Sequence, residues 1–230
     1  MISALRRADD SRRGRMYSAR VAAPKKHLGV VLFPRFELLD AFGPLEMFGY
    51  APGIEIVVLA GRPGPVPSTQ GPATVAEFAL ADAPPTDLLL VPGGIGTRAL
   101  VGDEQFLDQL AKRARGAELV MSVCTGSGLL ARAGVLDGRR ATSNKAAFGW
   151  ATEQSDAVEW VKESRWVRDG KFVTSSGVAA GIDMALAVIA DLAGEEFAQT
   201  LANRTEYEWH SDPRWDPFAR IHGLAAPSPH

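Results

Sequence analysis

The stretch AELVMSVCTGSGLLARAG, residues 117–134, joins a short apolar run to a glycine-containing segment, and it holds the only cysteine of the chain. The run 118–123 is typical of a buried strand, and residues 125–136 are predicted to form a helix. Cys124 is therefore expected on a strand-to-helix turn.

Three more apolar runs, at 28–33, 54–60 and 87–94, share this character. Their hydrophobicity is nearly continuous, which indicates strands buried on both faces, as in a parallel sheet covered by helices. Predicted helices at 44–51 and 103–116 lie between the strands. The alternation predicts an α/β fold with right-handed crossovers.

Two regions depart from the alternation. Residues 63–85 are rich in proline and predict a hairpin-like excursion. Further strands are expected at 158–161, 165–170 and 171–176, with Asp169-Gly170 as a hairpin turn, and they precede a long helix at 178–194. The aromatic and proline-rich segment 207–221 is expected to pack over the body without forming a new element.

Composition narrows the functional classes. The chain has 230 residues, is 46% hydrophobic and carries a net charge of −2, so it has no overall field that would attract nucleic acid or an anionic membrane. Small-molecule and protein partners remain. Residues 1–26 carry +6 and the other 204 residues −8. We interpret 1–26 as a disordered basic extension or an upstream mis-start, with an organellar transit peptide as the alternative, and 27–230 as one domain with an ordered C-terminal segment.

The compartment is predicted from the thiol and from the lack of targeting signals. One cysteine permits no intramolecular disulfide. No apolar run reaches the roughly 18 residues of a membrane span, and the N-terminus lacks the apolar centre of a secretory signal. The cytoplasm is therefore the expected location.

The position of Cys124 suggests a nucleophile. In open α/β sheets, chemistry gathers at the carboxyl ends of strands, where helix N-termini and free amides favour a thiolate. We expect a thiol pKa below that of a free cysteine. Ser127 lies one turn into the helix and is the poorer candidate. The alternative interpretation of Cys124 is a small buried hydrophobic residue.

The glycine loop VPGGIGTRA, residues 91–99, follows the neighbouring strand. Gly93 and Gly94 can bring a backbone amide close to a substrate, and that amide with the one of Thr125 would form a two-donor oxyanion hole. Residues 94–99 also fit the dinucleotide pattern G-x-G-x-x-A, but that motif needs an acidic residue near the end of the next strand. Here Glu118 lies at its beginning, so no nicotinamide cofactor is expected.

Asp40 and His210 are the remaining candidates. Asp40 is either the cap of a helix that begins at Gly43-Pro44 or a carboxyl group near the sulfur, able to move a proton if enclosure raises its pKa. His210 is the one histidine expected to approach a site. A Cys-His dyad is poorly supported, and His210 with Asp212 is interpreted as a structural hydrogen-bonding pair, so no metal site is expected.

Four segments together resemble the ThiJ/PfpI family of the class I glutamine amidotransferase-like superfamily, particularly its isocyanide hydratase-like branch. They are LLDAFGPLE (38–46), LLLVPGG (88–94), SVCTGSGLLARAGVLDGRRATSN (122–144) and SSGVAAGIDMAL (175–186). The resemblance implies a flavodoxin-like three-layer sandwich with a mainly parallel sheet and a cysteine nucleophile elbow. It also implies a homodimer without metal or organic cofactor.

The resemblance assigns roles to residues. Cys124 becomes the nucleophile, Asp40 its acidic partner and Thr125 the adjacent hydroxyl residue, while Gly94 and Thr125 supply oxyanion-hole amides. The expected pocket residues are Ile95, Asn144, Val178 and His210. Where many relatives read Thr-His-Trp, this chain reads Ser143-Asn144-Lys145, which suggests a different substrate preference.

The resemblance favours hydration of an isonitrile to an N-substituted formamide. Two alternatives stay open: a cofactor-free glyoxalase acting on α-oxoaldehydes, and a non-catalytic redox or ligand sensor of the same fold. Proteolysis is disfavoured because the peptidase-like branch has His directly after its cysteine, where this chain has Thr125.

Overall fold

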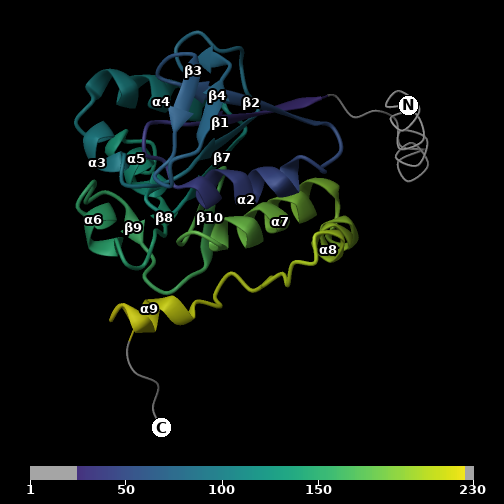
Figure 1. The fold of residues 1–230 in the computed structure, drawn as a ribbon. Helices are drawn as coiled ribbons and strands as arrows, with labels where there is room; N and C mark the ends of the chain where they lie inside the picture. Colours follow the sequence, from purple (N-terminus) through teal and green to yellow (C-terminus); the bar gives the residue numbers. More distant parts are fainter. Residues whose placement is uncertain (1–24, 226–230) are drawn as a thin grey trace, which may run out of the picture.

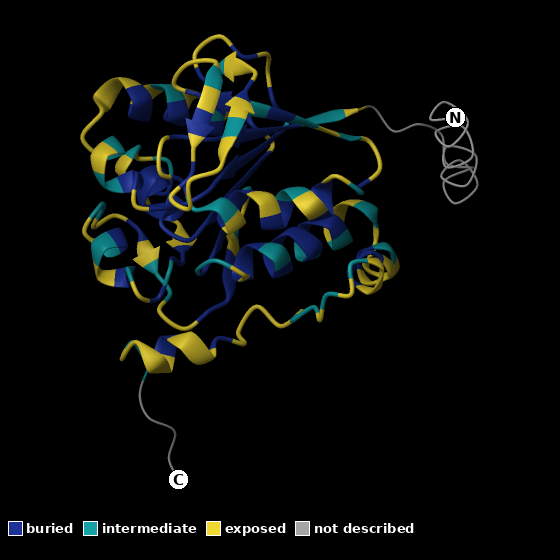
Figure 2. Ribbon diagram, in the orientation of Figure 1, coloured by how far each residue is buried: buried dark blue, intermediate teal, exposed yellow. Residues whose placement is uncertain are grey.

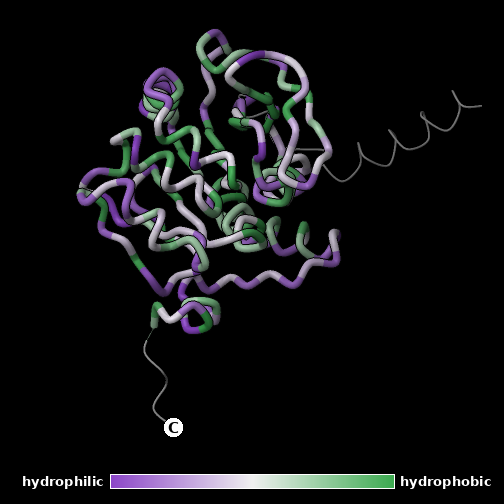
Figure 3. The backbone as a smooth tube through the Cα atoms, turned by 60° about the vertical axis from the view of Figure 1, so that its left-hand side comes forward, coloured by the Kyte–Doolittle hydropathy of each residue, from purple (hydrophilic) through white to green (hydrophobic). Residues whose placement is uncertain are grey.

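The computed structural model describes residues 25–225. Most of the predicted basic extension lies outside this range, and the first strand begins at Lys26, one residue before the boundary expected from the sequence. Hydrophobic segments gather in the interior of the molecule, and polar segments lie mostly on its outer turns (Figure 3).

The core of the fold is a seven-stranded sheet with the order β10-β11-β7-β6-β1-β2-β5. Its strands are β1 (Lys26–Val31), β2 (Ile54–Ala60), β5 (Phe78–Ala79), β6 (Leu88–Val91), β7 (Leu119–Val123), β10 (Trp166–Asp169) and β11 (Phe172–Ser175). All neighbouring strands are parallel except the β10–β11 hairpin, which turns at Asp169-Gly170 as expected. The mainly parallel sheet is confirmed.

Helices cover both faces of the sheet (Figure 1). They are α2 (Leu38–Phe48), α3 (Thr97–Leu100), α4 (Glu104–Gly116), α5 (Gly126–Arg132), α6 (Phe148–Thr152), α7 (Ala180–Ala193), α8 (Glu195–Arg204) and α9 (Pro217–Ile221). Helices α2 and α7 lie side by side on one face, and α4 and α5 lie toward the other. The central strands β6, β7 and β11 are entirely buried (Figure 2), whereas β2, β5 and β10 are partly exposed.

Two short ribbons complete the architecture. The proline-rich excursion forms an antiparallel hairpin of β3 (Gly64–Pro67) and β4 (Ala73–Ala76), as expected. Strand β8 (Arg140–Ala141) pairs in parallel with β9 (Glu159–Trp160).

The prediction that a helix begins at Gly43-Pro44 is wrong. Helix α2 begins six residues earlier, at Leu38, and Pro44 lies inside it. A proline there removes one backbone hydrogen bond. The helix tolerates this loss because its buried face packs against α7, where Gly43 meets Ile182 and Pro44 meets Gly181.

The expectation that segment 207–221 contains no element is also wrong, because residues 217–221 form α9. Asp216 caps this helix by accepting hydrogen bonds from the N–H groups of Phe218 and Ala219 at 3.1 and 3.3 Å. Pro217 occupies the first helical turn, where a missing N–H costs nothing.

Parallel strands β1, β6 and β7 end at one edge of the sheet, so the segments that follow them meet there. Gly126, just after Cys124, passes directly over the end of β6. A Cβ at Gly126 would lie 2.2 Å from the carbonyl oxygen of Val91. The backbone just after Cys124 thus packs directly against the end of the neighbouring strand.

We predict that Gly126→Ala destabilises the protein by about 1–3 kcal/mol, the usual cost of overpacking. Gly116→Ala is the matched control, because nothing lies within 4 Å of a Cβ at that position. Urea denaturation of both variants measures the difference. Equal stability of Gly126→Ala and wild type would show that the turn is not held by this contact.

Candidate active site

Cys124 follows β7 in a left-handed backbone conformation, with φ of 59°. This conformation costs a residue other than glycine roughly 1–2 kcal/mol. The Cys124 N–H is shared between the carbonyl oxygens of Ser175 and Ser176, each at 3.2 Å. The turn is therefore the expected nucleophile elbow, anchored to the end of β11.

Two hydroxyl groups support the elbow from the other side. Ser127 and Ser143 donate hydrogen bonds to the Cys124 carbonyl oxygen at 3.1 and 2.9 Å. Both serines are fully buried. Ser127 thus positions the cysteine, which agrees with its being the poorer nucleophile.

Asp40 lies in the first turn of α2 and is fully buried. It does not cap the helix, because the N-cap is Glu37. Its Oδ2 accepts the Gly93 N–H at 2.9 Å, whereas Oδ1 has no hydrogen-bond partner of ordinary geometry among the described residues. Burial raises the pKa of Asp40 to about 8. At neutral pH this carboxyl group therefore holds a proton.

The thiol and the Asp40 carboxyl interact directly, because each shifts the pKa of the other. Burial, and then the negative charge of Asp40, raise the pKa of Cys124, while the backbone and side chain of Thr125 lower it. The expectation of a depressed thiol pKa is therefore wrong. Cys124 is only 7% exposed, and desolvation of the thiol outweighs the effect of the nearby amides.

The glycine loop brings Gly94 against Thr125 as expected. The Gly94 N–H donates to Thr125 Oγ1 at 3.1 Å, and Thr97 Oγ1 donates to the Gly94 carbonyl oxygen at 2.7 Å. The Gly94 amide is thus occupied by a hydroxyl group. It would serve an oxyanion only after this hydroxyl turns away.

Arg98 is a residue of the site that the sequence interpretation did not single out. It donates to Thr97 Oγ1 at 2.9 Å and stacks over the Trp150 ring at 3.9 Å. Burial lowers the pKa of Arg98, and the charge of Cys124 raises it, so the guanidinium lies within electrostatic reach of the sulfur. The sequence signal was a lone arginine in the loop that follows β6.

Three of the four expected pocket residues come together. Asn144, Val178 and His210 line a pocket of about 600 Å³, next to Ser176. Ile95 is absent from its lining and is 42% exposed.

His210 does not pair with Asp212, so that prediction is wrong. The His210 ring stacks on Trp215 with centroids 3.9 Å apart, and Asp212 accepts hydrogen bonds from Arg214 instead. Within residues 25–225, no group of three or more His, Cys, Asp or Glu side chains is placed to hold a metal ion. No helix in that range is both long and apolar enough to cross a bilayer.

We predict that Asp40 makes stability fall with pH. Its pKa rises from an ordinary 3.8 to about 8 on folding, so between these values the folded state holds a proton that the unfolded state has released. The free energy of unfolding therefore decreases across about pH 4–8. Asp40→Asn removes this contribution.

The measurement is urea denaturation of wild type and Asp40→Asn at several pH values. Wild type should lose stability relative to the variant as pH rises through this window. Asp191→Asn, on the exposed side of α7, controls for loss of a surface carboxylate. Parallel curves for wild type and Asp40→Asn would contradict a buried, proton-holding Asp40.

Comparison with known proteins gives consistent matches. The DJ-1/PfpI family matches residues 26–191. Isonitrile hydratase from Pseudomonas putida is 37% identical over 180 residues, which cover 78% of each protein. The crystal structure of a ThiJ/PfpI family protein from Pseudomonas syringae has a TM-score of 0.73 and 31% identity, over 84% of this chain and 79% of that one.

A transcriptional regulator is similar to part of this chain. The HTH-type transcriptional regulator CdhR from Pseudomonas aeruginosa is 34% identical over 141 residues, which cover 61% of this chain and 41% of the regulator. The parallel sheet, the cysteine elbow and the extent of the family match agree, and the chain belongs to the DJ-1/PfpI family.

Proposed function

We propose that this protein hydrates isonitriles to N-substituted formamides, with Cys124 as nucleophile and Asp40 as proton donor and acceptor. The observation that supports this most is the buried pair of a thiol and a carboxyl group that holds its proton at neutral pH. The likeness to isonitrile hydratase adds support.

The chemistry of an isonitrile suits this pair. The terminal carbon must gain both a sulfur and a hydrogen, so a nucleophile and an acid have to act at one atom. Cys124 forms the S–C bond, the Asp40 carboxyl protonates the carbon, and the thiol proton passes to Asp40. The product is a thioimidate, in which carbon is bonded to sulfur, hydrogen and nitrogen.

Water completes the reaction. Asp40 acts as general base when water adds to the thioimidate carbon and the nitrogen gains a proton. The C–S bond then breaks, the N-substituted formamide leaves, and sulfur regains its proton. The overall balance is one isonitrile plus one water, without any change in redox state and without a cofactor.

The surrounding groups have supporting roles in this proposal. The Thr125 backbone and hydroxyl group lower the pKa of Cys124, and the positive charge of Arg98 favours negative charge on sulfur. Gly93 holds Asp40 in place through its N–H. The cytoplasm is the compartment we propose, because a free thiol persists in a reducing environment.

We predict that purified protein converts cyclohexyl isonitrile to N-cyclohexylformamide, measured by mass spectrometry. Cys124→Ala should abolish turnover, and Asp40→Asn should reduce kcat/KM about 10²–10⁴-fold, the range for loss of general acid-base catalysis. Asp191→Asn, far from the pair, should keep wild-type activity. Wild-type kcat/KM should fall above about pH 8, where Asp40 loses its proton.

The alternatives give different results in this assay. Conversion of methylglyoxal to lactate, without isonitrile hydration, would favour the glyoxalase. Turnover of neither substrate, together with ligand binding or formation of a sulfinate on Cys124, would favour a sensor, the role suggested by the regulator relative.

A homodimer is part of the proposal. Leu39 and Phe42 on α2 are 42% and 41% exposed beside a groove that includes Tyr50 and Ile182. An apolar face of this kind suits a second copy. Phe42→Glu should therefore shift the mass in light scattering from dimer to monomer. A wild-type monomer at micromolar concentration would contradict the proposal.

A further inference from the structure

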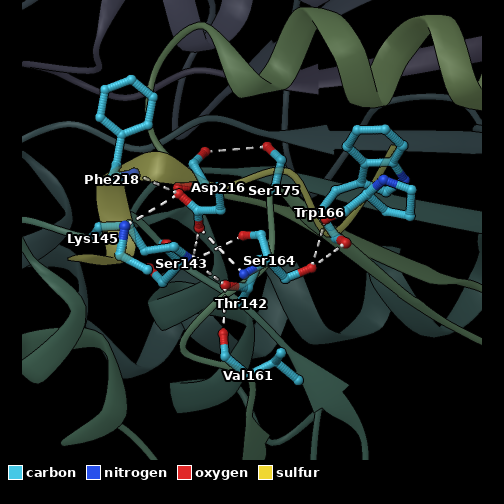
Figure 4. A network of polar contacts seen from close by, with 12 residues as sticks. Thr142, Ser143, Lys145, Val161, Ser164, Trp166, Ser175, Asp216 and Phe218 are labelled. Atoms are coloured by element: carbon cyan, nitrogen blue, oxygen red, sulfur yellow. Dashed lines mark hydrogen bonds and ion pairs between the residues drawn. The ribbon is translucent and has the colours of Figure 1, made fainter. Parts of the chain in front are cut away.

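A buried ion pair holds the C-terminal segment to the body. Lys145 Nζ lies 3.1 Å from Asp216 Oδ2, and each side chain is about 1% exposed (Figure 4). Lys145 also donates to Thr142 Oγ1 and to the Ser164 carbonyl oxygen at 2.6 and 2.9 Å. Asp216 also caps α9 and accepts the Ser164 N–H at 3.2 Å, so the ion pair and this hydrogen bond together hold the helix to the body.

A second anchor lies at the other end of the segment. Asp183 of α7 accepts hydrogen bonds from the Tyr207 hydroxyl group at 3.1 Å and the His210 N–H at 3.0 Å, and it pairs with buried Arg165. The Arg165 N–H donates to the Pro213 carbonyl oxygen at 2.7 Å. We call residues 207–222, held at these two places, the C-terminal strap.

The strap forms one wall of the 600 Å³ pocket, through residues that include Trp215 and Phe218. Ser176 also lines the pocket, and it contacts the elbow directly because its carbonyl oxygen accepts the Cys124 N–H. Asn144 lines it as well and follows Ser143, which donates to the Cys124 carbonyl oxygen. The pocket thus adjoins the segments that hold the nucleophile.

The buried cations that line this pocket are not free to bind an anionic ligand group. Its two buried cations, Lys145 and Arg165, are each neutralised by a buried carboxylate. By contrast, Trp215 and Phe218 leave 41% and 44% of their surface exposed. Large exposed aromatic groups beside a pocket indicate a binding surface for apolar groups.

We propose that the C-terminal strap is the specificity-determining wall of the site, and that Trp215 and Phe218 receive an uncharged, ring-sized substituent on the isonitrile nitrogen. This inference rests on the proposed function. Before attack the isonitrile is linear, so its substituent points away from the sulfur while the terminal carbon meets Cys124. When the S–C bond forms, the carbon and nitrogen become bent, and the substituent then lies beside the elbow, next to the adjoining pocket. The adjoining pocket of about 600 Å³ is large enough for a single ring.

The test compares two isonitriles that differ in the substituent. Trp215→Ala and Phe218→Ala should each reduce kcat/KM for cyclohexyl isonitrile about 10-fold or more, as expected for lost apolar contact, and leave methyl isonitrile nearly unchanged. Ile221→Ala is the matched control, since Ile221 lies on α9 and is 70% exposed but does not line the pocket. An equal loss for both substrates would overturn the inference.

A binding measurement separates this inference from the proposed function. Calorimetry with N-cyclohexylformamide on Cys124→Ala needs no turnover. Binding that weakens at least several-fold on adding Trp215→Ala supports the strap even if no isonitrile is hydrated. Binding that is absent, or unchanged by that substitution, overturns it. Dissociation of a dimer by Trp215→Ala in light scattering also overturns it, since the wall would then face a second copy.

Discussion

The Cys124 N–H, shared between two carbonyl oxygens at the end of β11, is the contact on which the site depends. It holds a cysteine in a left-handed backbone that a free chain would avoid. The serine hydroxyl groups on the Cys124 carbonyl oxygen and the contact of Gly126 with Val91 restrain the same turn from other directions. Several elements together therefore hold Cys124 in its strained backbone conformation. This places the sulfur at the edge of the sheet where the ends of β1, β6 and β7 meet.

This rigid placement determines the electrostatics. The thiol and the carboxyl group are both buried and lie side by side, so a negative charge on one opposes a negative charge on the other. The two groups therefore titrate as a pair. A site that favoured a free thiolate would expose the sulfur to water and amides. Here the arrangement instead keeps a proton beside a nucleophile, which suits a carbon that must receive both.

The sequence predicted the sheet and the elbow well, because strand burial and a turn at the strand end depend on local pattern. The sequence-based predictions were wrong for features that depend on contacts between residues far apart in the chain. The thiol pKa depends on Asp40, 84 positions away in the chain, and the early start of α2 depends on packing against α7. Asp216-Pro217 was a readable helix start that the proline-rich context obscured. The partnership of Lys145 with Asp216 has no local signature at all.

That partnership explains two features which the sequence showed separately. Ser143-Asn144-Lys145 follows strand β8, and the chain continues past α8 in an aromatic segment. In the structure these two segments are in direct contact. Ser143 donates to the Cys124 carbonyl oxygen, Asn144 lines the pocket, and Lys145 pairs with Asp216 of the strap. A buried lysine needs its carboxylate, because an unpaired buried charge costs several kcal/mol. Lys145 and Asp216 therefore depend on each other, and under the proposed function a change in the strap would alter specificity without touching Cys124 or Asp40.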